Sequence, residues 1–131
     1  MASGAWQINN YPSTATAASA SIAAPASAKA VGQITRLRSL QATVACGATA
    51  QTPIELVVRD GASGTGTIIA SFALAAPADG FASLQQTPLD LRASLGNALT
   101  VEFAAANVAA SQSAVSAQGD FVPQGYPMFQ E

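Results

Sequence analysis

The sequence holds few side chains that could carry out catalysis. Among its 131 residues there is no histidine and only one cysteine, Cys46. A cysteine-protease dyad and a Cys/His zinc site both need histidine, and an intramolecular disulfide needs a second cysteine. None of these can be built within one copy of the chain. We expect Cys46 to be a small buried side chain in a strand.

Two glutamates are the best candidates for acid–base chemistry. Glu55 and Glu102 lie in alternating, strand-like segments and could form the carboxylate pair of a glycoside hydrolase. Both fall at the outward phase of their segments, which predicts a solvated sheet face, and aromatic residues, which would line such a cleft, make up only 6% of the chain. We therefore do not expect an enzyme. Thr100 shares the outward phase, and Arg59 is expected to form an ion pair between strands or subunits.

The glycine-rich segment Gly61–Gly66 resembles a phosphate-binding loop only superficially. It lacks the lysine of a P-loop and no helix is expected after it, so a nucleotide site is not predicted. The dipeptide Asp60-Gly61 instead predicts the turn of a β-hairpin, because glycine reaches positive φ without a Cβ clash.

Isolated aspartates are expected to cap backbone amides in turns. They lack the dense acidic spacing of calcium-binding loops, so we expect neither a metal nor a cofactor. These residues are Asp60, Asp79, Asp90 and Asp120.

The composition predicts one domain with a thin core of small residues. Half of the residues are hydrophobic, only 9% are charged, and the net charge is −2. Such a core favours an oligomer or a subunit of a larger assembly. Without a basic stripe, nucleic acid is not an expected partner. No apolar stretch is long enough to span a membrane, and the N-terminus lacks the pattern of a signal peptide, so neither a membrane partner nor export is expected.

Hydrophobic alternation predicts a series of short strands separated by turns. The expected strands cover residues 17–24, 31–44, 54–59, 68–74, 81–86, 99–105 and 113–122, with an extended edge segment at 87–91. Such a series indicates an all-β fold, an antiparallel β-sandwich of the jelly-roll kind. We expect a single domain at residues 17–122, with an N-terminal arm at 1–16 and a C-terminal tail at 123–131.

One of these segments also fits a helix. Between Val31 and Val44 the apolar residues follow a helical period over most of the length and alternate only towards the end. We favour a strand, bulged near Arg36 to Arg38, because glycine and threonine stand where strong helix formers would be expected.

Four aromatic residues lie outside the expected strands and are the candidate partner-binding residues. They either pack against the ends of the sandwich itself or anchor the chain to a neighbouring subunit, since aromatic side chains are enriched at interfaces. These residues are Trp6, Tyr11, Tyr126 and Phe129.

In this order, the elements resemble a family of small virion proteins of tailed bacteriophages. The resemblance rests on the combination of four segments, Gly4–Ile8, Leu56–Thr67, Gly96–Phe103 and Val115–Phe121. It covers most of residues 17–122 and leaves the tail from Pro123 unexplained. It implies a β-sandwich or jelly-roll structural subunit that decorates the capsid as a cement protein or forms part of a fibre.

The resemblance therefore implies a non-enzymatic virion protein that is assembled in the cytoplasm of a bacterial host. The expected partners are other copies of the chain, as a trimer, and the major capsid protein. A fibre or receptor-binding module is the first alternative. A carbohydrate-binding module is the second, although it would need a flat aromatic platform on one sheet face.

Overall fold

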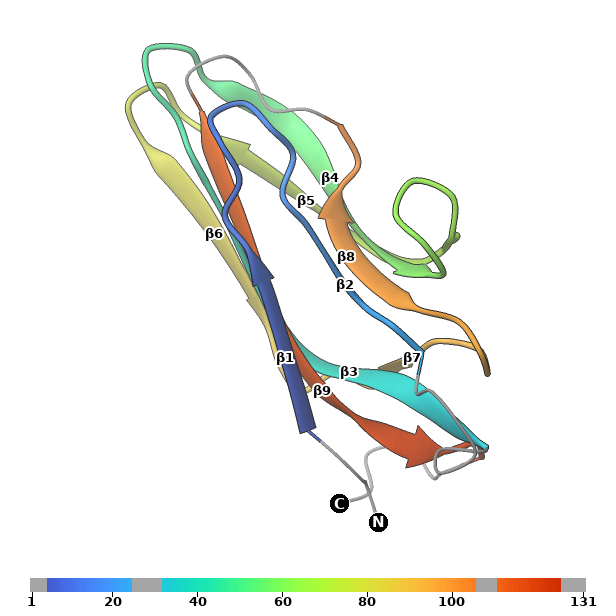
Figure 1. Ribbon diagram of the computed structural model, residues 1–131. Coiled ribbons are helices and arrows are strands. Elements are labelled where there is room, and N and C mark those ends of the chain that lie inside the picture. The colour runs from blue at the N-terminus through green and yellow to red at the C-terminus, as the bar shows by residue number, and fades with distance from the viewer. Residues whose placement is uncertain (1–4, 25–31, 106–110, 126–131) are drawn as a thin grey trace.

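The structure is a computed structural model of the chain and describes residues 5–24, 32–105 and 111–125 (Figure 1). Within these residues the protein is a sandwich of two antiparallel sheets. The strands are β1 Ala5–Asn10, β2 Ser19–Ile22, β3 Gln33–Ala45, β4 Gln51–Asp60, β5 Thr67–Ala76, β6 Phe81–Gln86, β7 Leu91–Arg92, β8 Leu99–Phe103 and β9 Gln112–Pro123.

The strand pairings are nested along the chain. β4 pairs with β5, β3 with β6, β2 with β8, and β1 with β9, as in one long hairpin folded back on itself. Two further pairings, β9 with β3 and β8 with β4, roll this hairpin into sheet I, ordered β1-β9-β3-β6 with β7 beside β3, and sheet II, ordered β2-β8-β4-β5. This is a jelly roll, and it confirms the predicted fold class.

The core between the sheets consists mainly of aliphatic side chains at alternate positions. Leu40, Ala42 and Val44 of β3 face Leu56 and Val58 of β4 within one cluster of buried residues. Strand alternation places every second side chain in this layer. The single cysteine, Cys46, is only partly buried and packs against the rim of the same cluster.

The ambiguous segment is a strand, as predicted, and it contains the expected irregularity. The pairing of β3 with β9 shifts between Leu37 and Ser39, which leaves Arg38 as the extra residue of a β-bulge. Because of this insertion, both Leu37 and Leu40 reach the core, although they are three positions apart.

The predicted N-terminal arm is wrong for residues 5–10. These residues form β1, which pairs along its whole length with β9, so the sandwich begins earlier than residue 17. Trp6 is only 8% exposed, and its Nε1 donates a hydrogen bond to the carbonyl oxygen of Asp120 at 3.1 Å. Its ring lies over Gly119, where an added Cβ would approach ring atom Cζ2 to 2.5 Å. A glycine in mid-strand here makes room for the tryptophan.

Candidate interaction surface

The predicted partner-binding aromatics have different environments. Trp6 is buried in the protein's own core and is not available to a partner. Tyr11, in the connector after β1, is 74% exposed. Tyr126 and Phe129 lie outside the described residues. The structure therefore leaves Tyr11 as the candidate anchor that can be described.

The sequence predicted that Glu102 faces solvent. In the structure its side chain is buried, and the residue is only 5% exposed. One carboxylate oxygen, Oε1, accepts hydrogen bonds from the hydroxyls of Ser19, at 3.0 Å, and Ser63, at 2.5 Å. The other, Oε2, accepts from Nε of Arg59 at 2.6 Å and from the amide of Gly64 at 2.9 Å. The connector between β4 and β5, the green loop in Figure 1, is thus tied to β8.

These contacts also set the ionisation of Glu102. Burial opposes the charged carboxylate, but the hydrogen bonds from Ser63, Gly64, Arg59 and Ser19 outweigh it and lower the pKa of Glu102 below its usual value. Both oxygens are occupied by donors within the protein. In the pairing of β4 with β8, Glu102 lies opposite Val57, two positions from Glu55, which is exposed.

Thr100 is likewise buried, contrary to the sequence-based expectation. Its hydroxyl donates to the carbonyl oxygen of Gly61 at 2.9 Å and shares a 2.7 Å hydrogen bond with the hydroxyl of Ser21. The alternation itself was predicted correctly, since Leu99 and Val101 face the core. The outward phase of β8 is buried because polar side chains and the β4–β5 connector lie against it.

Asp60 binds a second loop through hydrogen bonds. It also caps a backbone amide, which was predicted from the sequence. Its carboxylate accepts hydrogen bonds from the amide and hydroxyl of Ser94, at 2.9 and 2.5 Å, and from the Asn97 side chain at 2.9 Å. Partial burial raises the pKa of Asp60, but the Ser94 and Asn97 hydrogen bonds prevail and hold it below its usual value. The end of β4 is therefore bound to the loop before β8.

A buried ionic cluster at one end of sheet I could not be predicted from the sequence. Arg36, 1% exposed, donates from Nε and Nη2 to the two carboxylate oxygens of Asp120, both at 2.8 Å. Arg92 likewise forms a bidentate pair with Asp90, at 2.7 and 3.0 Å. Arg38 lies 3.7 Å from Asp120. Asp90 and Asp120 thus pair with arginines, which the sequence did not predict.

The outer face of sheet I carries the clearest surface feature. We define the amide face as ten outward side chains of β1, β3, β6 and β9, which are mostly amides and hydroxyls. They begin beyond the β3 bulge and stop before Ala45, Phe81 and Gln112, which lie at the end of the same side of the sheet. Strand register places these residues on one side of the sheet. They are Gln7, Asn9, Ser39, Gln41, Thr43, Ser83, Gln85, Ala114, Ser116 and Gln118.

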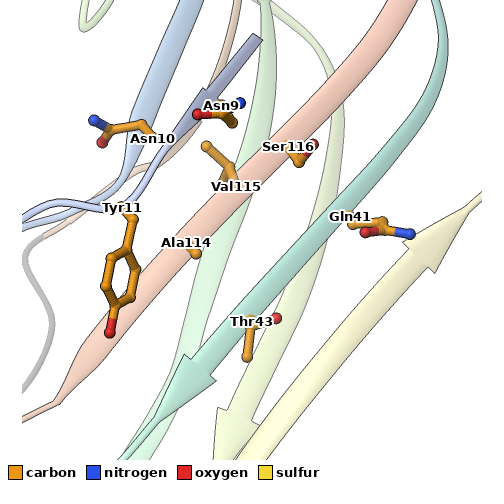
Figure 2. A pocket seen from close by; sticks show the side chains of 8 residues that line it. All are labelled: Asn9, Asn10, Tyr11, Gln41, Thr43, Ala114, Val115 and Ser116. Carbon is orange, nitrogen blue, oxygen red and sulfur yellow. The ribbon is translucent and has the colours of Figure 1, made fainter. Parts of the chain in front are cut away.

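A groove of about 280 Å³ runs across this face beside Tyr11. Figure 2 shows the Tyr11 side chain on one side of β9 and Gln41 and Thr43 on the other, with Ala114 and Ser116 between them. The side chains that lie between Tyr11 and Gln41, those of Ala114 and Ser116, are small.

In the part of the chain that the structure describes, the exposed large apolar side chains lie at strand edges and loops. They are Tyr11 at 74%, Phe81 at 70%, Leu95 at 51% and Ile68 at 46% exposure. β5 and β6 are edge strands of their sheets, so Ile68 and Phe81 are placed where a neighbouring chain could contact them.

Within residues 5–24, 32–105 and 111–125, no group of three or more acidic, cysteine or histidine side chains is arranged to hold a metal ion. The same residues include no helix of the length and apolarity needed to cross a membrane.

Comparison with known proteins identifies similarity in fold alone. No protein-family model matches the chain, and no curated protein sequence matches it. Among solved structures, the coat protein of tobacco streak virus is similar over 97% of this chain and 91% of the coat protein, with a TM-score of 0.37 and 11% sequence identity.

Proposed function

We propose that the protein is a non-enzymatic structural component of a virus particle, and more specifically a capsid decoration protein of a tailed bacteriophage. In this role it clamps neighbouring coat subunits from the outside of the shell. The sequence resemblance to small virion proteins supports this proposal, as does a jelly-roll fold, which is common among capsid proteins. Because a fold hosts many functions, the proposal depends on how the charged and apolar side chains are used.

The observation that carries the proposal is that, within the described residues, the arginines and most of the carboxylates bind groups of the same chain. Arg36, Arg38, Arg59 and Arg92 each lie within ion-pair distance of a carboxylate of the same chain. Glu102 and Asp60 hold loops against strands through hydrogen bonds. A catalytic carboxylate needs room for substrate, whereas these are surrounded by donors. The arrangement suits a rigid subunit that contacts its neighbours through exposed aromatic and aliphatic side chains.

Association with the shell can be tested by co-sedimentation. Particles encoded by the same genome, but lacking this chain, would be incubated with purified protein and sedimented. The proposal predicts saturable binding in many copies per particle, and a thermal release of packaged DNA that shifts to higher temperature on binding. Absence of binding to such particles would contradict it. Light scattering of the free protein tests the proposed trimer separately.

A fibre or receptor-binding module is the second candidate. The groove beside the exposed Tyr11 favours it, because that groove could take a ligand without help from a neighbouring subunit. Binding to host cells by protein that does not bind the shell would support this candidate instead.

A further inference from the structure

We propose that the amide face binds a neutral oligosaccharide, with Tyr11 as the aromatic contact. The inference names a ligand class for the second candidate function and is tested on the purified protein alone. A capsid protein can also carry a glycan-binding face. Absence of shell binding would therefore contradict the proposed function, whereas absence of glycan binding would contradict only this proposal.

The first observation is a row of polar side chains across four strands. Register pairs Asn9 with Ser116, Ser116 with Gln41, and Gln41 with Gln85, so their side chains lie side by side on the outer face of sheet I. Adjacent strands are spaced by roughly 4.8 Å, which gives the row a length of roughly 14 Å. A short oligosaccharide can extend along such a row.

The second observation is that these amides are not used within the protein. Among the described residues, the side chains of Asn9, Gln41 and Gln85 make no hydrogen bond, and all three residues are exposed. Elsewhere amides are engaged: Oδ1 of Asn10 accepts from the amide of Ser19 at 3.0 Å, and Gln112 donates to the carbonyl of Pro12. The face therefore presents donors and acceptors in equal measure.

The third observation is that the connector carrying Tyr11 is fixed although its ring is exposed. The contacts of Asn10 and Gln112 hold the backbone on both sides of Tyr11, and the amide of Ala15 donates to the carbonyl of Ser111 at 2.7 Å. A connector whose backbone is already fixed loses less entropy when a ligand packs on its side chain. The groove runs between this ring and Gln41 (Figure 2).

This combination fits a sugar better than a protein. A protein interface usually has an apolar, dehydrated centre and a polar rim, whereas here Ser116 and Gln41 occupy the centre and the aromatic ring lies at one side. Hydroxyl groups of a sugar can donate to and accept from amide side chains, and the apolar face of a sugar ring can pack on tyrosine. No charged side chain lies among the residues that define the amide face, which favours a neutral ligand.

The test uses an array of immobilised neutral oligosaccharides, including glucans, mannans, galactans and chitooligosaccharides, alongside acidic ones. We expect the full chain to retain a neutral glycan, and titration of that glycan to shift the NMR amide signals of Asn9, Gln41 and Ser116. Tyr11→Ala should weaken binding by about tenfold or more. Tyr11→Phe should retain most of it, because the ring remains.

Two further variants test whether a loss of glycan binding comes from the amide face or from a general effect on the protein. Gln41→Glu removes the amide donor and adds charge, so it should also reduce binding, whereas Ile68→Ala changes an exposed side chain away from the amide face and should not. Unaltered folding of each variant is checked by circular dichroism. The proposal is wrong if no neutral glycan is retained, if only acidic glycans bind, or if Tyr11→Ala binds as well as the unchanged protein. Loss of shell binding by Tyr11→Ala without any glycan binding would assign the face to a protein partner.

Discussion

Thr35 and Thr100 are both completely buried, yet they differ in the use of their hydroxyl groups. The hydroxyl of Thr35 has no hydrogen-bond partner within the described chain, whereas that of Thr100 bonds Gly61 and Ser21. A buried hydroxyl without a partner costs desolvation free energy that an apolar group of the same shape avoids.

Replacement by valine is therefore expected to change the free energy of unfolding in opposite directions at the two threonines. Thr35→Val should raise the free energy of unfolding by about 1 kcal/mol, and Thr100→Val should lower it by about 1–2 kcal/mol. Urea melts of both variants measure the difference. Equal destabilisation by the two substitutions would show that Thr35 has a partner in solution.

Glu102 predicts a stability change at acid pH. Its folded-state pKa is below the usual value, so its contribution is complete above the unfolded-state pKa of about 4.3 and is lost as the pH falls further, through the folded-state pKa. Glu102→Gln should cost about 1–3 kcal/mol at neutral pH, because it weakens charge-assisted hydrogen bonds.

The same variant supplies the control for this pH dependence. Below the usual glutamate pKa, the free energy of unfolding should fall less steeply in Glu102→Gln than in the unchanged protein. Asp60, whose pKa is lowered too, should leave part of the slope in place. Parallel curves for the two proteins between neutral pH and about pH 3 would mean that Glu102 is not held as the structure shows.

Strand β9 must accommodate the Trp6 ring at Gly119. An added Cβ would lie 1.9 Å from the carbonyl oxygen of Arg36 and within 3 Å of the ring, so the strand or the ring must move. Gly119→Ala should destabilise the protein by about 1–3 kcal/mol or more.

Fluorescence offers a direct measurement, since Trp6 is the only tryptophan. Displacement of its ring should shift the emission to longer wavelength in Gly119→Ala. The matched control is Ser116→Ala on the same strand, which faces outward and should leave the emission unchanged. An unshifted spectrum in Gly119→Ala would contradict the packing of β1 on β9.

At the level of elements, the sequence predicted most strands from their alternation, including the short β2 and β8, but missed β1. β3 and its bulge follow from the apolar positions and from Gly32, Thr35 and Thr43, which are weak helix formers. β1 carries only Trp6 and Ile8 as large apolar residues before Asn9 and Asn10, which is too few for a period. Its place in the sheet is fixed by pairing with β9, more than a hundred positions away.

The polar contacts were unpredictable for a related reason. The phase of β8 was correct, but its outward side is buried by a connector that no local pattern brings to it. Arg36 and Asp120 are 84 positions apart, and only the pairing of β3 with β9 sets them side by side. Sequence periodicity describes one strand at a time, whereas these contacts depend on which strands become neighbours.

For the whole molecule, β1 belongs to the sandwich and its removal should destabilise the fold. Deleting residues 1–10 removes an edge strand and the buried Trp6, and loss of a core tryptophan alone costs about 3–5 kcal/mol. Thermal melts followed by circular dichroism should show a much lower midpoint. Tyr11→Ala, next to the deletion but exposed, should melt like the unchanged protein. An unaltered midpoint in the truncated protein would show that residues 1–10 form an arm that does not stabilise the sandwich.

The central claim is that this chain is a structural part of a virus shell. Electron cryomicroscopy of particles encoded by the same genome, carried to a resolution that separates strands, tests it most directly. The account predicts density for this jelly roll on the outside of the capsid, repeated with the symmetry of the shell and touching more than one coat subunit. Density for the chain at a tail-fibre tip alone, or none in the particle, would contradict it.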